Sequence, residues 1–323
     1  MANIVIDAHV HSLRFSPGIV KSGEEWAYDT LEEKLFTTQP WDNSPRLLLD
    51  MDRNRVDIAV LNSAFNMRNE MIYEQVRRNP NKFVGLAGFI ETLRKVYAGE
   101  SKFSEKAAAE ELDQWLEKPE FVGAGELLAL PDPSLDTGWE ENFRKIIPIM
   151  EVIKKHQKPV LFHTGWIKYP NARLKAVDPG LIDELALMYP SVPIIVGHMG
   201  VQAGWYQTFP EIALMVAARH DNVYLESSQA TSEQIYRAYL DPHIGPSKIL
   251  YGSDYGTSIS YSRIGDRTYA TTHIPPKYLP DHFGWNIRQI QLLDIPEDDR
   301  NQILGLNAAK IFKLDLKKFG LKI

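Results

Sequence analysis

Ile4-Val5-Ile6-Asp7-Ala8-His9-Val10-His11 is the stretch from which both the fold and a site can be inferred. The apolar run at residues 4–6 predicts a short buried strand. Because side chains alternate along a strand, we expect Asp7, His9 and His11 to point to one face. Two imidazoles on one face, two residues apart, can hold one metal ion. Three polar residues at this strand end therefore indicate a site rather than a piece of core.

Short apolar segments recur along the chain, and longer helical patterns lie between them. The expected strands are Ile4–His9, Asp57–Asn62, Phe83–Phe89, Val122–Leu127, Pro159–His163, Pro193–His198, Val223–Glu226 and Ile249–Asp254. Examples of the expected helices are Pro45–Arg55, Asn69–Arg78, Ser104–Leu116, Trp139–His156, Pro179–Met188, Phe209–Arg219 and Thr231–Leu240.

Eight strands alternating with helices predict an α/β fold, a (β/α)8 TIM barrel. The later strands start roughly 25–40 residues apart, a spacing typical of βαβ units. We expect one domain covering residues 1–323. An open doubly wound sheet is the alternative, but no Gly-rich dinucleotide fingerprint follows the first strand.

The composition is that of an ordinary globular chain, with 323 residues, 44% hydrophobic and 24% charged, and a net charge of −6. No Lys/Arg block indicates a nucleic-acid surface, and no apolar stretch is long enough to cross a bilayer. The absence of cysteine excludes disulfides, thiolate metal sites and a cysteine nucleophile. The first strand begins too early for a signal peptide, so we expect a cytoplasmic protein.

Two long connections depart from the simple repeat. They are Ser12–Asn43 after the first strand and Tyr255–Pro280 after the eighth. In a barrel both lie on the face that binds ligands, so we expect lids or pocket walls. Decoration or an oligomer contact is the alternative.

Polar side chains stand where the expected strands end. His9 and His11 end the first strand, His163 the fifth, His198 the sixth and Asp254 the eighth. Neutral imidazoles and a carboxylate are the usual ligands of zinc and similar ions when thiolate is absent. His9, His11, His163 and Asp254 would supply three nitrogens and one oxygen. His198 would then be available for proton transfer.

Other residues leave alternatives open. A lone histidine at a strand end is usually structural, and the metal interpretation depends on all four positions together. Asp7 is expected to orient a ligand imidazole, with a hydrogen bond to backbone as the alternative. Glu126, at the end of the fourth strand, could bind the metal, bridge a second one, contact substrate or pair with a ligand histidine. The candidate substrate contacts are Arg263, Arg267, Trp166 and Tyr255, each of which could equally be a solvated or packing residue.

In this order, the strand-end motifs resemble the amidohydrolase superfamily, and most closely its amidohydrolase-2 branch, which includes aminocarboxymuconate-semialdehyde decarboxylase. The matching motifs are residues 6–11, Gly125-Glu126, His163-Thr164-Gly165, Gly197-His198-Met199-Gly200, 224–228, Tyr251-Gly252-Ser253-Asp254 and the closing helix 303–312.

The resemblance implies a barrel with one divalent metal ion, expected to be zinc, with manganese as the alternative. It implies that His9, His11, His163 and Asp254 are ligands and that His198 is catalytic. Asp254 would also take a proton from water. Many members with two metals carry a carboxylated lysine where this chain has Glu126, a departure that favours one metal.

The expected activity is hydrolysis of a small carboxylate-bearing ester, lactone or amide through a metal-activated water. The alternative is non-oxidative decarboxylation of a small unsaturated or aromatic acid at the same metal site. A binding protein that has lost catalysis is a third hypothesis, disfavoured because no metal-site position is missing. The expected partners are a small-molecule substrate and, in a homodimer, a second copy of the chain, with no nucleic acid and no membrane.

Overall fold

The computed structural model describes residues 4–14, 35–165, 173–201, 207–256, 260–264, 267–271 and 281–321. Eight strands form one sheet whose order follows the chain and whose neighbouring strands are all parallel. The strands are β1 Ile6–Val10, β4 Ile58–Asn62, β5 Phe83–Ala87, β6 Phe121–Leu127, β7 Val160–Phe162, β8 Ile194–Val196, β9 Val223–Glu226 and β10 Ile249–Leu250. The eight expected strands are all present, with shifted ends.

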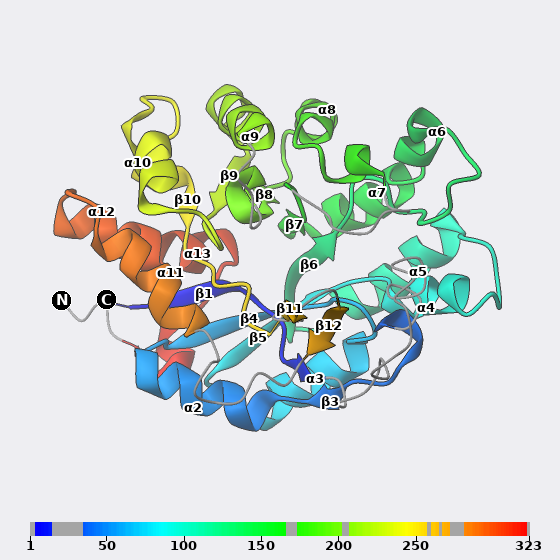
Figure 1. Ribbon diagram of the computed structural model, residues 1–323, viewed down its shortest axis with the longest axis horizontal. Helices are drawn as coiled ribbons and strands as arrows, with labels where there is room; N and C mark the ends of the chain where they lie inside the picture. The colour runs from blue at the N-terminus through cyan, green and yellow to red at the C-terminus, as the bar shows by residue number, and fades with distance from the viewer. Residues whose placement is uncertain are drawn as a thin grey trace.

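The sheet closes because the segment that follows β10 returns to β1 (Figure 1). Three backbone hydrogen bonds form the seam. Ala8 N–H donates to Tyr251 O over 3.0 Å, Asp254 N–H to His9 O over 2.9 Å, and His11 N–H to Tyr255 O over 2.7 Å. The predicted (β/α)8 barrel is confirmed.

Helices lie around this barrel (Figure 1). They are α2 Ser44–Asn54, α3 Asn69–Arg78, α4 Ile90–Tyr97, α5 Glu105–Leu116, α6 Trp139–Arg144, α7 Ile147–His156, α8 Gly180–Met188, α9 Thr208–Arg219, α10 Ser232–Leu240, α11 His282–Gln291, α12 Glu297–Asn301 and α13 Asn307–Ile311. Short 3-10 turns are η1 Leu174–Val177, η2 Gly197–Gly200, η3 Pro246–Lys248 and η6 Leu316–Phe319, and η5 Gln302–Leu306 is a π-turn.

The helical layer differs from the prediction in several places, and α11 is among the helices that were not expected. The expected helix Trp139–His156 is two helices, α6 and α7, because Pro148 lies in the first turn of α7, where its missing N–H is tolerated. Helix α4 was not expected. Its N-terminus is capped from another helix, since the Glu111 carboxylate accepts from the backbone N–H groups of Glu91 and Thr92 over 3.0 and 2.9 Å. Local sequence does not reveal such a tertiary cap.

The core has two apolar layers. Alternate residues of β4 divide between them, with Ile58 and Val60 in the inner layer and Ala59 and Leu61 in the outer one. The outer layer contains the buried faces of the helices. The inner layer fills the barrel and continues into the C-terminal segment through Ala308, Ala309, Ile311, Phe312 and Leu316. Helix α13 therefore closes the end of the barrel opposite the carboxyl ends of its strands.

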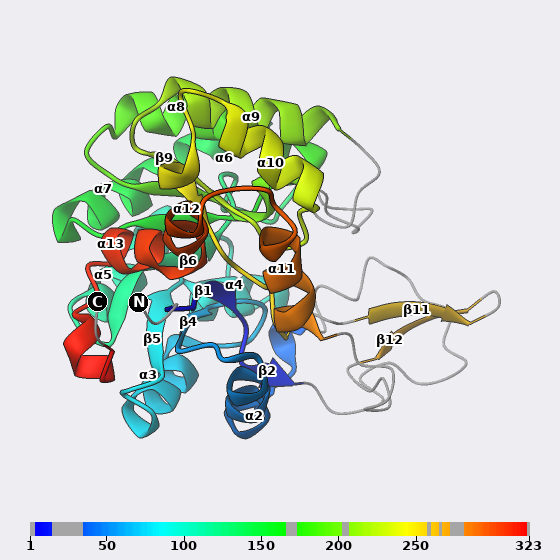
Figure 2. The same cartoon turned by 90° about the vertical axis from the view of Figure 1, so that its left-hand side faces the viewer.

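The described parts of the two long connections form small antiparallel pairs. Strand β2 Leu13–Arg14 pairs with β3 Trp41–Asp42, and β11 Ser260–Ile264 pairs with β12 Arg267–Thr271. Figure 2 shows the β11–β12 hairpin standing away from the barrel. Most of both connections lies outside the described residues.

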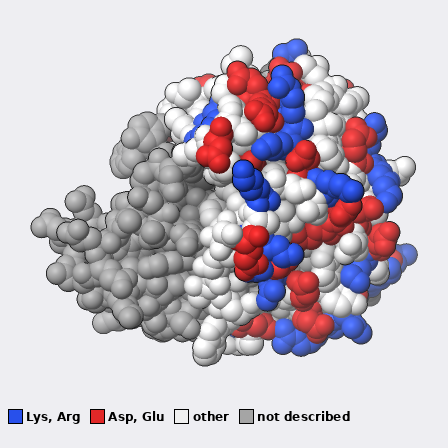
Figure 3. All heavy atoms as spheres, turned by 90° about the vertical axis from the view of Figure 1, so that its right-hand side faces the viewer, with Lys and Arg blue, Asp and Glu red and all other residues white. Residues whose placement is uncertain are grey.

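On the side where α5 and α6 lie in Figure 1, acidic and basic side chains are interspersed (Figure 3). None of the helices in the described ranges is long and apolar enough to span a membrane.

The close packing at the seam predicts that Gly256→Ala destabilises the fold strongly. Gly256 has φ +91°, and a Cβ there would lie 1.8 Å from His11 O. Gly320 is the matched control, because its φ is +75° and a Cβ would meet nothing within 4 Å. We expect Gly320→Ala to lower the free energy of unfolding by about 1 kcal/mol and Gly256→Ala by about 3 kcal/mol or more. Urea denaturation followed by tryptophan fluorescence measures both, and equal losses would contradict the steric argument.

Candidate active site at the barrel mouth

His9 and His11 stand at the end of β1, where the strand is irregular. Asp7 pairs with Ala59 and Val10 with Leu61, so β1 gains one residue relative to β4. Such a bulge redirects side chains. The Nε2 atoms of His9 and His11 lie 3.0 Å apart, and both residues are fully buried. The two imidazoles meet at a bulge rather than along a strictly alternating strand.

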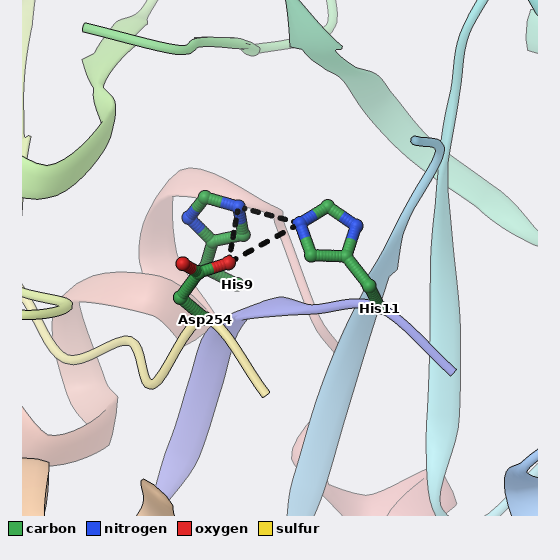
Figure 4. A group of neighbouring side chains, drawn as sticks. All are labelled: His9, His11 and Asp254. Atoms are coloured by element: carbon green, nitrogen blue, oxygen red, sulfur yellow. Dashed lines mark hydrogen bonds and ion pairs between the residues drawn. The ribbon is translucent and has the colours of Figure 1, made fainter. Parts of the chain in front are cut away.

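Asp254 reaches these histidines from the segment after β10 (Figure 4). Its Oδ1 lies 3.5 Å from His11 Nε2 and 3.9 Å from His9 Nε2. Its Oδ2 accepts a hydrogen bond from the Gln229 amide. The ligand atoms of His9, His11 and Asp254 all lie within 4.8 Å of one another, a spacing that could hold one metal ion.

Glu126, near the end of β6, lies among four imidazoles. Its Oε2 is 3.4 Å from His9 Nε2 and 3.5 Å from His11 Nε2. Its Oε1 is 2.7 Å from His163 Nδ1 and 3.3 Å from His198 Nε2. The structure thus brings together six residues that were singled out in the sequence. We call them the mouth cluster: His9, His11, Glu126, His163, His198 and Asp254.

Acceptors behind the rings determine which ring nitrogens face the centre. His9 Nδ1 lies 2.9 Å from Glu226 Oε2, and His11 Nδ1 lies 3.1 Å from Asn62 O. A carbonyl and a carboxylate can only accept, so each Nδ1 carries a proton. Each Nε2 then presents a lone pair.

The donor set fits a divalent metal. Lone pairs on two Nε2 atoms only 3.0 Å apart repel each other unless a positive charge lies beside them. Imidazole nitrogens and carboxylate oxygens are also the ligands that zinc and manganese take when no thiolate is present. In the metal-free chain, a proton on His9 partly relieves the repulsion between the two lone pairs. Burial lowers the pKa of His9, but the charges of Glu126 and Glu226 outweigh it and hold this pKa well above its usual value.

The carboxylates of the cluster are held in their charged form. Burial raises the pKa of Glu126, but the charges of His9 and His163 bring it well below its usual value. Burial likewise raises the pKa of Asp254, and the nearby histidines, His198 first among them, bring it below its usual value. Both groups can therefore accept a proton or bind a cation at neutral pH.

Three residues at the site were given no role from sequence. Glu226, the last residue of β9, is fully buried and accepts from His9 Nδ1, the His198 backbone N–H and Ser228. Ser228 Oγ lies 2.7 Å from His198 Nδ1. Gln229 donates to Asp254. The signal for Glu226 was its place at the end of an expected strand, the same signal that identified the histidines.

Several residues around the site have left-handed backbones. The φ angles are +60° at His198, +49° at Met199, +62° at Gln229 and +55° at Asp254. A non-glycine residue in this region costs about 1–2 kcal/mol, and such residues concentrate at functional sites. The turns after β8, β9 and β10 therefore aim their side chains by means of an uncommon backbone conformation.

Asp7 lies behind the mouth cluster. Its Oδ1 accepts from the backbone N–H of His9 over 2.9 Å and from that of Ser253 over 3.1 Å. The ring of His9 is oriented by Glu226, and Asp7 contacts its backbone. Desolvation raises the pKa of Asp7 to about 7.

The candidate substrate contacts are only partly visible. Trp166 and the side chains of Arg263 and Arg267 lie outside the described residues. The ring of Tyr255 stacks on Phe283 with centroids 4.9 Å apart, and its hydroxyl donates to Asp50 over 2.8 Å. Tyr255 is thus packed against the barrel wall.

A closed (β/α)8 barrel with imidazoles and carboxylates at the carboxyl ends of its strands defines a class of enzyme that acts on small molecules at a metal centre. A family model described as amidohydrolase, of the amidohydrolase-2 type, matches residues 6–314. The chain belongs to this family. No curated protein sequence matches it.

Solved structures share the fold at low identity. A 2,6-dihydroxybenzoate decarboxylase bound to 2,6-dihydroxybenzoate is 16% identical, with a TM-score of 0.61 over 97% of this chain and 100% of that chain. A dihydroxybenzoic acid decarboxylase from Polaromonas, with manganese and 2-nitroresorcinol, is 20% identical, with a TM-score of 0.57 over 97% and 98%. A probable 2-pyrone-4,6-dicarboxylic acid hydrolase from Acinetobacter baumannii is 15% identical, with a TM-score of 0.55 over 96% and 99%. At these identities the likeness shows the fold.

The raised pKa of Asp7 predicts that this residue makes the stability of the fold depend on pH. The folded chain keeps this carboxyl protonated up to about pH 7, whereas the unfolded chain ionises it near 3.8. Its contribution to stability therefore falls as the pH rises from about 4 to about 7. Asp7→Asn keeps an Oδ1 acceptor and removes the ionisation. We expect the stability of this variant, relative to wild type, to increase by roughly 2 kcal/mol between pH 5 and pH 8.

Urea denaturation of the metal-free protein at both pH values measures this difference. Asp294→Asn, at an exposed aspartate, is the control and should leave the difference between the two pH values unchanged. The prediction would be contradicted if the difference in free energy of unfolding between wild type and Asp7→Asn were the same at pH 5 and pH 8.

Proposed function

We propose that this protein is a metal-dependent hydrolase of a small carboxylate-bearing ester, lactone or amide. The observation that supports it most directly is the position of two proton-transfer groups, with Asp254 beside the Nε2 atoms of His9 and His11 and His198 beside His9. Hydrolysis needs a base for the attacking water and an acid for the leaving group, and two such groups serve both needs.

The proposed metal ligands are His9, His11, His163 and Asp254, with Glu126 in contact with three of them through hydrogen bonds or ion pairs. One divalent ion, zinc or manganese, is proposed. Bound there, it would polarise the substrate carbonyl and lower the pKa of a water molecule.

The chain's own residues would then move the protons. Asp254, ionised at neutral pH, takes a proton from the water as its oxygen bonds to the carbonyl carbon. A proton carried by His198 passes to the leaving oxygen or nitrogen as its bond to that carbon breaks. Ser228 and Glu226 hold the His198 ring in place meanwhile. Arg263 and Arg267 are proposed to bind the substrate carboxylate away from the cluster.

Decarboxylation of a small unsaturated or aromatic acid is the second candidate. The observation that favours it is the fold shared with two hydroxybenzoate decarboxylases. In that case the same residues would hold the metal, and His198 would deliver a proton to the carbon that loses carbon dioxide.

Metal analysis followed by a substrate panel tests the proposal. We expect one equivalent of a divalent metal after loading with zinc or manganese, and turnover of at least one lactone, ester or amide. The loaded enzyme is incubated in parallel with aromatic carboxylates. Release of carbon dioxide without hydrolysis of any panel member would select the second candidate. A protein that binds no metal would overturn both.

His198→Asn should separate proton transfer from metal binding. Asparagine is smaller, neutral and unable to carry a proton between groups, so we expect kcat to fall by about 10²–10⁴ while metal content is unchanged. Metal content is measured on the same preparation as kcat. Loss of metal in the variant would instead make His198 a ligand.

A further inference from the structure

The Glu226 carboxylate contacts both halves of the mouth cluster. Its Oε2 accepts from His9 Nδ1 over 2.9 Å, from the His198 backbone N–H over 3.0 Å and from Ser228 Oγ over 2.8 Å. Its Oε1 accepts from the Ser228 backbone N–H over 2.5 Å. All four partners can donate, so one buried carboxylate organises a candidate metal ligand and the candidate proton-transfer histidine.

The direction of these hydrogen bonds determines two tautomers. The carboxylate can only accept, so the proton of His9 lies on Nδ1 and its Nε2 faces His11. Ser228 has one hydroxyl proton, which it donates to Glu226, so it must accept from His198 Nδ1 over 2.7 Å. The His198 Nε2, 3.3 Å from Glu126 Oε1, then points at the centre of the cluster.

The surroundings leave this carboxylate little freedom. Glu226 is fully buried, and the backbone of Gly252 passes so close that a Cβ there would lie 1.9 Å from Glu226 Oε1. Gly252 lies two residues before Asp254. The segment that delivers Asp254 to the mouth cluster therefore also confines Glu226.

We propose that Glu226 is a positioning residue that sets His9 for metal binding directly and His198 for proton transfer through Ser228. This inference rests on the proposed function for the roles of the two histidines. The hydrogen-bond chain itself is independent of the reaction.

Three variants separate the contact of Glu226 with His9 from its contact, through Ser228, with His198. We call these two contacts the two branches. Glu226→Gln keeps the shape but places an amide donor where the carboxylate accepts, so it opposes donors on both branches. Ser228→Ala removes only the hydroxyl between Glu226 and His198. Ser227→Ala is the matched control, because the neighbouring Ser227 hydroxyl is also buried yet has no hydrogen-bond partner among the described residues.

We expect Glu226→Gln to weaken zinc binding by about 10–100-fold. Ser228→Ala should keep the zinc Kd within about threefold and lower kcat by about tenfold or more, with KM unchanged. Ser227→Ala should change neither. Zinc affinity is measured by competition with a chromogenic chelator, and kcat on the substrate found in the panel.

Nitrogen-15 NMR of histidine-labelled, zinc-loaded protein supplies a readout that loss of packing alone would not produce. Wild type should show His9 and His198 protonated at Nδ1. Ser228→Ala should change the tautomer of His198 alone, and Glu226→Gln should change both. If Glu226→Gln does not fold, the His198 tautomer in Ser228→Ala still decides the proposal.

An unchanged His198 tautomer in Ser228→Ala would overturn the proposal, as would wild-type zinc affinity in a folded Glu226→Gln. Failure of the proposed function is distinguishable, because it shows as a wild-type protein that turns over no panel substrate. The tautomers of that protein still report whether Glu226 organises the two rings.

Discussion

Closure of the barrel between β1 and β10 is the constraint on which the site depends. The seam bonds join backbone groups 243 to 245 residues apart in the sequence, and one of them, from Asp254 N–H to His9 O, places a carboxylate directly beside His9 and His11. His9 and His11 alone supply two candidate metal ligands, and Asp254 alone supplies one. The seam brings the three together. Gly256 allows the seam to close, because any side chain there would strike His11 O.

The eight strands could be predicted from the sequence because each contains a short apolar run, and most of these runs end in a polar residue. The same reading located His163, His198 and Asp254, since the carboxyl ends of parallel strands converge at one end of a barrel. Helix α4 could not be predicted in this way, because Glu111 caps it from α5. The separation of α6 from α7 had a visible signal in Pro148, which a longer helical pattern obscured.

The residues of the site were easier to predict from the sequence than the contacts between them. Strict alternation would place Asp7 with His9 and His11, but the bulge in β1 breaks this alternation and leaves Asp7 bonded to backbone. The orientation of the His9 ring comes instead from Glu226, which is distant in sequence. The spacing of residues along one strand does not tell which residue of another strand they contact. The role of Glu226 therefore became visible only in the three-dimensional structure.

The left-handed turns after β8, β9 and β10 bear on how this site could be re-engineered. His198, Gln229 and Asp254 each occupy a conformation that β-branched side chains strongly avoid. Libraries that randomise these positions would mostly yield backbones that no longer aim a side chain at the centre, even where the chemistry of the replacement is suitable. Glycine would relieve the strain but remove the functional group. New specificities are therefore better sought by exchanging whole connections between strands than by point changes at the strand ends.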